Sequence, residues 1–153
     1  MKKVNLLLII FIGLLISSCS SGDDNTELST EKILVQNSPW TFDHYEIIGV
    51  VDVINIDFTM KGLESEVNQK VSGNVFNFNL DGTGSRFFPE EETSFFQWEI
   101  LKNNQLKITF NGGSIRTVFK ELKVSSSQLT FEAESVSFGV FKALHTGKYF
   151  YKN

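Results

Sequence analysis

Residues that commonly perform chemistry are sparse in this chain of 153 residues. The two histidines, His44 and His145, lie about a hundred residues apart, and no ligand spacing typical of a metal site connects them. We interpret each as a surface or loop imidazole, and only their meeting in one cleft would favour an enzyme. The sequence holds no Gly-x-Ser-x-Gly elbow. We therefore predict no catalytic residue, no metal site and no cofactor.

Two short motifs imitate binding loops. Asn77-x-Asn79-x-Asp81-Gly82 begins like a calcium-binding EF-hand loop, but Phe88 occupies the twelfth position, where that loop needs a bidentate Glu. The run Asp81-Gly82-Thr83-Gly84 lacks the Lys and the following helix that a phosphate loop would use. A strand followed by a tight turn explains both motifs better.

An acidic cluster, Glu90 to Glu92, lies between the aromatic pairs Phe87-Phe88 and Phe95-Phe96. A solvated loop is the favoured interpretation; the alternative is a mouth loop that repels anions or meets a basic partner. Adjacent strand residues point to opposite faces, so one Phe of each pair must lie outside the fold or on a flap. The candidate rim or partner-contact residues are Phe87, Phe88, Glu90, Glu91, Glu92 and Phe95.

The composition is that of one globular domain with a small appendage: 41% of the residues are hydrophobic and 21% are charged. The net charge is −4, which argues against nucleic acid as a partner. Fifteen phenylalanines, about a tenth of the chain, are the unusual feature. Their positions decide the fold and the candidate site.

The first residues are typical of a targeting signal. Lys2 and Lys3 precede the apolar run Leu6–Ile16, which as a helix would span about 16 Å, well short of a ~30 Å hydrocarbon core. Ile16-Ser17-Ser18-Cys19 resembles a bacterial lipobox, which would attach lipid to Cys19; ordinary signal cleavage is the alternative. We expect a signal peptide over 1–18, a flexible acidic tether over 19–32 and the folded domain over 33–153.

The predicted tether also bears on location. Its polar, acidic stretch from Ser20 to Glu27 resembles the surface-export signal of Bacteroidota lipoproteins. Ser20 replaces the Asp that retains many lipoproteins at the inner membrane. We therefore expect an outer-membrane lipoprotein at the cell surface, with the membrane as partner through Cys19; a periplasm-facing lipoprotein is the alternative.

From Trp40 onward, apolar residues recur with a period of two, which indicates antiparallel strands separated by short turns. Only Thr30 to Gln36 looks helical, with Thr30 as the cap. Seven to nine strands with one apolar face can form a sandwich or a closed sheet. Because no long crossover is visible, we predict an all-β, lipocalin-like up-and-down barrel of about eight strands.

The alternation also predicts the register of the central hairpins. The first expected set is Ile100/Leu106, Trp98/Ile108 and Phe96/Phe110, joined by a loop of three or five residues with a left-handed Asn. The second is Phe110/Ile115, Ile108/Thr117 and Leu106/Phe119 across a two-residue Gly112-Gly113 loop, with Ile115 and Phe119 inside. A bulge near Lys120-Glu121 should then restore the phase, so that Leu122 pairs with Phe131 and Val124 with Leu129. Lys107 should point outward.

Aromatic side chains dominate the predicted inward face. They could form a packed core, or part of them could surround a cavity for an apolar molecule. The candidate cavity-lining residues are Trp40, Phe42, Phe76, Phe78, Phe96, Trp98, Ile100 and Phe110.

Three segments carry a resemblance to a known family: Phe78 to Gly84 (F-x-x-D-G-T-G), Trp98-Glu99-Ile100, and Asn104 to Ile108 (N-x-L-x-I). With Trp40 near the domain start, they resemble the lipocalin-like lipoproteins widespread in Bacteroidota, over roughly residues 33–153. The resemblance implies a small barrel behind a lipid anchor, with a function that is largely unassigned.

Two functional hypotheses follow. The leading one is a lipid-anchored, non-catalytic binding module for a small hydrophobic or amphipathic ligand. The alternative is an interaction lipoprotein whose packed barrel presents loops, such as Lys61 to Lys70 and Pro89 to Ser94, to a surface protein.

Overall fold

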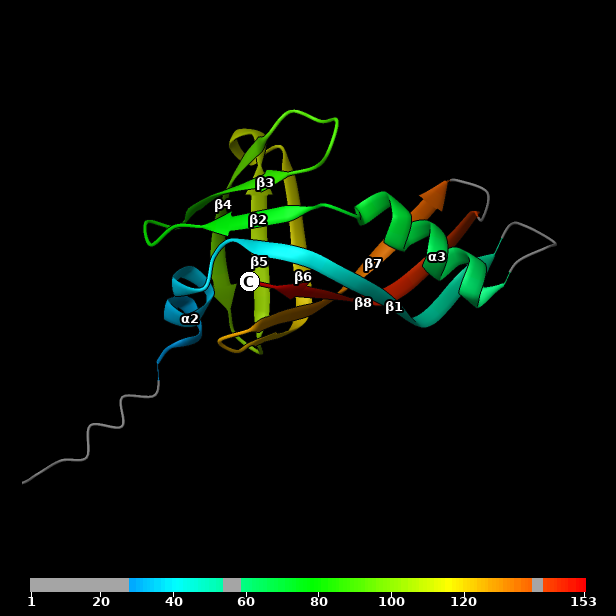
Figure 1. Cartoon of the computed structure of the whole chain (residues 1–153), viewed down its shortest axis with the longest axis horizontal. Coiled ribbons are helices and arrows are strands. Elements are labelled where there is room, and N and C mark those ends of the chain that lie inside the picture. Colours follow the sequence, from blue (N-terminus) through cyan, green and yellow to red (C-terminus); the bar gives the residue numbers. More distant parts are fainter. Residues whose placement is uncertain (1–27, 54–58, 139–141) are drawn as a thin grey trace, which may run out of the picture.

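The computed structural model describes residues 28–53, 59–138 and 142–153. Eight antiparallel strands follow one another around a closed barrel in sequence order, which confirms the predicted up-and-down topology over the sandwich (Figure 1). The predicted signal peptide, Cys19 and most of the tether lie outside the described residues. The strands are β1 (Trp40–Val53), β2 (Val75–Phe78), β3 (Thr83–Phe87), β4 (Ser94–Leu101), β5 (Gln105–Phe110), β6 (Ile115–Val124), β7 (Gln128–Phe138) and β8 (Lys142–Lys152).

Three of the strands are longer than the barrel. β1 pairs with β2 only at Trp40 and Thr41, whereas it pairs with β8 as far as Val53. β7 likewise pairs with β6 only near its start and with β8 along its whole length. The surplus lengths of β1, β7 and β8 therefore leave the barrel together as a three-stranded extension, with helix α3 (Met60–Val71) packed along it (Figure 1).

The predicted register of the β4–β5 hairpin is confirmed. Phe96, Trp98 and Ile100 pair with Phe110, Ile108 and Leu106, respectively. The connecting loop has three residues, and Asn103 and Asn104 both adopt left-handed backbone conformations, with φ of 61° and 52°. Lys107 faces outward and forms an ion pair with Glu99 on the neighbouring strand.

The β5–β6 pairing also has the predicted register, but its turn is wider than a two-residue loop, because residues 111–114 include the 3-10 turn η1 (Asn111–Gly113). Phe119 packs on Phe131 inside the barrel. The prediction that Ile115 lies inside is wrong: its side chain is 52% exposed, because Ile115 is the first residue of β6, at the end of the barrel.

The predicted bulge is present in β6. Lys120 pairs with Glu132 and Lys123 with Thr130, so Glu121 and Leu122 together lie opposite Phe131. Glu121 takes the strained conformation, with φ of 49°. The extra residue returns Leu122 to the buried face, and Val124 pairs with Leu129 as expected.

Helix α2 (Thr30–Gln36) occupies the range predicted from the sequence and lies beside one end of the barrel (Figure 1). Ser29, not Thr30, is its cap and accepts a hydrogen bond from Lys32 N–H. The indole Nε1 of Trp40 donates to the carbonyl oxygen of Leu34 at 2.8 Å, and both side chains are fully buried. Residues 30–32, assigned above to the tether, therefore belong to a helix that closes the barrel.

Helix α3 was not predicted: its residues 61–70 were interpreted as a loop. Thr59 caps it through Gly62 N–H, and Leu63 and Val67, one turn apart, are its only buried side chains. So narrow an apolar stripe among charged residues gives a weak helical signal. Among the described residues, no helix is both long enough and apolar enough to cross a membrane.

Candidate functional site

The eight candidate cavity-lining residues do not share one cavity. Most of them pack against each other and fill the half of the barrel next to α2. For example, the rings of Phe78 and Trp98 meet edge to face with centroids 5.5 Å apart, and those of Phe96 and Phe110 do so at the same distance. Trp40, Phe42, Phe78 and Phe96 are buried in this core, and Trp98 and Ile100 pack against it. Only Phe76 and Phe110 also reach the cavity described next.

A cavity of about 210 Å³ lies at the opposite end of the barrel, where the extension leaves it. Phe131, Tyr149 and Tyr151 form much of its wall, and Ala133 leaves room between them. Its lining residues are Val71, Asn74, Phe76, Arg86, Phe88, Phe110, Thr117, Phe119, Phe131, Ala133, Glu134, Ser135, Tyr149 and Tyr151.

Arg86 is the only basic residue among the described residues that line this cavity. It lies on β3 two residues after the buried Gly84, so its side chain points into the barrel. The guanidinium carbon lies 4.7 Å from the ring centre of Phe88 and 4.8 Å from that of Phe110. Among the described residues no acceptor hydrogen-bonds to the buried Nε atom, and burial lowers the pKa of Arg86.

The buried amide and phenol groups of the cavity already have partners. The hydroxyl of Tyr151 donates to Asn74 Oδ1 at 2.9 Å, and Asn74 Nδ2 donates to the carbonyl oxygen of Phe87. The hydroxyls of Tyr149 and Ser135 share a hydrogen bond of 2.9 Å. Burial raises the pKa of both tyrosines, which keeps the phenols neutral. Arg86 is therefore the charged group of this cavity that remains available to a ligand.

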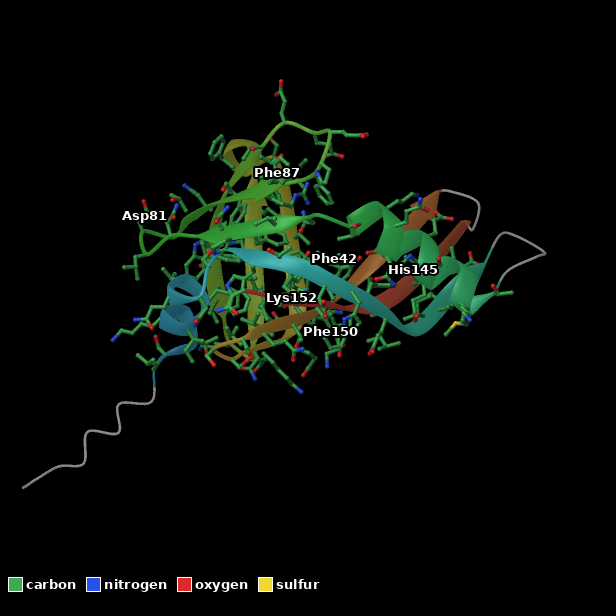
Figure 2. All side chains as sticks on the ribbon, in the orientation of Figure 1. Phe42, Asp81, Phe87, His145, Phe150 and Lys152 are labelled. Atoms are coloured by element: carbon green, nitrogen blue, oxygen red, sulfur yellow. The ribbon has the colours of Figure 1, made fainter. Side chains whose placement is uncertain are left out.

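The structure divides the candidate rim residues between two faces. Phe88 lines the cavity, whereas Phe87 and Phe95 are 44% and 72% exposed, respectively. Figure 2 shows Phe87 on the outside of the barrel. Each aromatic pair therefore has members on opposite faces, as predicted. Glu90, Glu91 and Glu92 are exposed in the β3–β4 connection, in accord with the solvated loop.

The two histidines do not meet in one cleft. His44 is half exposed, contacts Asp43 and stacks on Phe150. His145, interpreted above as a surface or loop residue, is fully buried on β8 near α3 (Figure 2). Its Nδ1 atom hydrogen-bonds to the hydroxyl of Tyr45 at 2.6 Å, and burial lowers the pKa of His145. The sequence-based interpretation was wrong because only the extension and α3 together cover this strand position.

The two motifs that imitate calcium-binding and phosphate-binding loops form the β2–β3 hairpin. In the β2–β3 turn, Asp81 Oδ1 accepts hydrogen bonds from the backbone N–H and the hydroxyl of Thr83. These bonds lower the pKa of Asp81. Gly82 adopts φ of 79°, which the turn requires. No group of three potential metal ligands occurs among the described residues.

Sequence reasoning missed Arg86, Tyr149 and Tyr151 as site residues. A signal for Arg86 existed, because the β2–β3 register places it on the same face as Phe76, with which it pairs. Comparisons with known proteins give no match: no family model, curated protein or solved structure is significantly similar to this chain. Function is therefore inferred from the geometry of the site.

Proposed function

We propose that this chain is a non-catalytic binding module that holds a small amphipathic ligand in the cavity at the open end of the barrel. The observation that carries this proposal is the cavity itself, an aromatic-lined space beside an otherwise packed core. Concave apolar sites with a few placed polar groups are typical of small-molecule binding.

The size of the cavity limits the ligand. At about 210 Å³ it is larger than the ~150 Å³ of an apolar cavity that holds benzene, and smaller than the roughly 300–1,000 Å³ of common ligand pockets. The enclosed part of the ligand is therefore about one aromatic ring or a short alkyl chain, with any remainder outside the mouth.

Filling the cavity tests the proposal. Ala133 lies on its wall, so Ala133→Leu should occupy the space, whereas Ala133→Ser keeps the volume nearly unchanged as the matched control. Benzyl alcohol added to the purified chain should shift the NMR signals of lining residues in the wild type and in Ala133→Ser, but not in Ala133→Leu. Native mass spectrometry of the untreated protein would reveal a co-purified ligand. No shift in the wild type and no bound mass would overturn the proposal.

We also propose that lipid on Cys19 anchors the chain at the outer membrane, with the barrel at the cell surface. The lipobox-like residues 16–19, the acidic stretch behind them and the resemblance to lipocalin-like lipoproteins support this. Cys19→Ser should abolish labelling by radioactive palmitate and release the protein from membranes. Protease added to intact cells should cleave a surface-exposed barrel and spare a periplasmic one.

A second candidate function has an observation of its own. Much of the barrel interior is solid, and two large aromatic side chains, Phe87 and Phe95, are exposed next to the acidic loop Glu90–Glu92. These features favour an interaction lipoprotein whose barrel is a scaffold. Cross-linking on intact cells, with Phe87 and Phe95 replaced by Ser or with Glu90–Glu92 replaced by Ser, tests it. An unchanged set of cross-linked products in both variants would exclude this face.

A further inference from the structure

The guanidinium of Arg86 is held in place without a polar partner. An arginine carries five N–H donors, and a buried arginine is normally paired with acceptors because its desolvation is costly. Here the guanidinium lies over the rings of Phe88 and Phe110, and its buried Nε atom has no acceptor among the described residues. The aromatic rings do not offer the oxygen acceptors that guanidinium N–H groups normally bind, so a ligand that enters the cavity can supply them.

The nearest acidic residues do not neutralise Arg86. Glu91 acts on Arg86 only as a nearby charge, and among the described residues the two form no ion pair. Glu134 also lines the cavity, but its exposed carboxylate lies 3.3 Å from Lys120 Nζ. A guanidinium edge in a partly dry, aromatic-walled space binds an anion more strongly than it would in water.

The charge and size of the site restrict the anion. One lining cation balances one negative charge, which disfavours a dianionic phosphate monoester. The guanidinium edge matches the two oxygens of a carboxylate in a bidentate arrangement. The remaining space is walled by Phe76, Phe131 and the tyrosine rings, which suit an apolar body.

We propose that Arg86 is the recognition residue for the carboxylate of a small monocarboxylic acid whose single ring or short alkyl chain occupies the cavity at the mouth of the barrel. This inference rests on the proposed function and names its ligand class.

Benzoate and benzyl alcohol are the probes, because both carry one ring and only benzoate is an anion. Their affinities for the purified full chain are measured by calorimetry or NMR titration. The variants are Arg86→Gln, Arg86→Lys and the matched control Arg116→Gln, which alters the other arginine at an exposed position of β6. Inorganic phosphate serves as a third probe.

Wild type and Arg116→Gln should bind benzoate at least tenfold more tightly than benzyl alcohol, since a charge-assisted pair contributes roughly a factor of ten to a hundred. Arg86→Gln should lose this preference and still bind benzyl alcohol, whereas Arg86→Lys should retain part of it. Phosphate should bind more weakly than benzoate. If Arg86→Gln does not fold, the preference for benzoate over benzyl alcohol in the wild type and in Arg86→Lys still tests the inference.

Equal affinity for the two ring probes in the wild type, an unchanged preference in Arg86→Gln, or tighter binding of phosphate would overturn the inference. Suppose that benzyl alcohol binds the wild type but not Ala133→Leu, and that benzoate binds the wild type no more tightly than benzyl alcohol. The carboxylate inference then fails, and the proposed binding function stands. If neither ring probe binds, both fail.

Discussion

The side chain of Asn68 in α3 hydrogen-bonds to both backbone groups of Tyr45, as the backbone of a neighbouring strand would. Its Oδ1 accepts from Tyr45 N–H at 2.8 Å, and its Nδ2 donates to the Tyr45 carbonyl oxygen at 3.0 Å. One turn earlier in α3, Glu64 accepts from Ile47 N–H at 3.2 Å. β2 pairs with β1 only at Trp40 and Thr41, so the rest of that edge of β1 would otherwise be open. Polar side chains of α3 therefore cover the edge of a strand, which reduces the risk of edge-to-edge association.

Removing this cover should destabilise the protein and expose the edge. Asn68→Ala leaves two backbone groups of Tyr45 without partners, which should lower the free energy of unfolding by ~1–3 kcal/mol. Urea unfolding measures that loss, and sedimentation velocity should show concentration-dependent association. Gln69→Ala, at the exposed neighbouring position, is the control and should change the stability by less than ~0.5 kcal/mol. Equal stability of the two variants would contradict the role given to Asn68.

Two glycines of the paired strands β1 and β8 should respond oppositely to alanine. A Cβ atom on Gly147 would lie 2.0 Å from atoms of the Tyr45 ring, whereas nothing lies within 4 Å of one on Gly49. Gly147→Ala should therefore cost at least ~1–3 kcal/mol by overpacking, and Gly49→Ala should be neutral or slightly stabilising. Thermal unfolding of both variants checks this. A Gly147→Ala protein with the wild-type midpoint would show that the Tyr45 ring does not lie over this glycine.

The buried His145 should make stability depend on pH. Burial lowers the pKa of His145 in the folded protein, against the weaker opposing influence of Glu66 in α3, while the unfolded chain titrates near pH 6.5. The unfolded state therefore binds more protons below that pH, so the stabilisation is present above about pH 6.5 and decreases as the pH falls below it. The slope is at most ~1.4 kcal/mol per pH unit for one proton.

The measurement is the free energy of unfolding between pH 8 and 5. His145→Gln should remove this component of the slope, although it also changes the partner of the Tyr45 hydroxyl. His44→Gln, at the half-exposed histidine, is the matched variant that removes the other imidazole. A wild-type slope in His145→Gln would assign the pH dependence to other groups.

The closed end of the barrel depends on one indole. Trp40→Phe removes the donor that binds the carbonyl oxygen of Leu34 and leaves a small void beside α2, so the free energy of unfolding should fall by ~1–3 kcal/mol. Hydrogen exchange should report faster opening of residues 30–36. Trp98→Phe, whose indole donates to the carbonyl oxygen of Thr83 at 2.9 Å, is the matched comparison and should leave exchange in α2 unchanged. Faster exchange in α2 of both variants would assign the effect to the whole barrel.

Much of the fold follows from local rules. The period-two alternation determines the strands, and the parity of each turn determines the register, because a shift by one residue would expose a whole apolar face. For this reason the β4–β5 and β5–β6 pairs and the bulge at Glu121 could be predicted from the sequence. Helix α3 could not, because its two buried side chains are buried only once the long strands project beyond the barrel.

By itself, the sequence determined an all-β meander, its central registers and which aromatic rings of the central hairpins point inward. Only the tertiary structure decided which inward side chains lie in the packed core and which line the cavity. Phe78 and Arg86 both face inward, yet Phe78 lies in the packed core and Arg86 in the cavity. The physical reason is that closing the sheet into a barrel sets the position of each residue along the barrel axis. Helix α2 covers one end of the barrel, while the long strands β7 and β8 extend beyond the other end and leave a cavity beside Arg86.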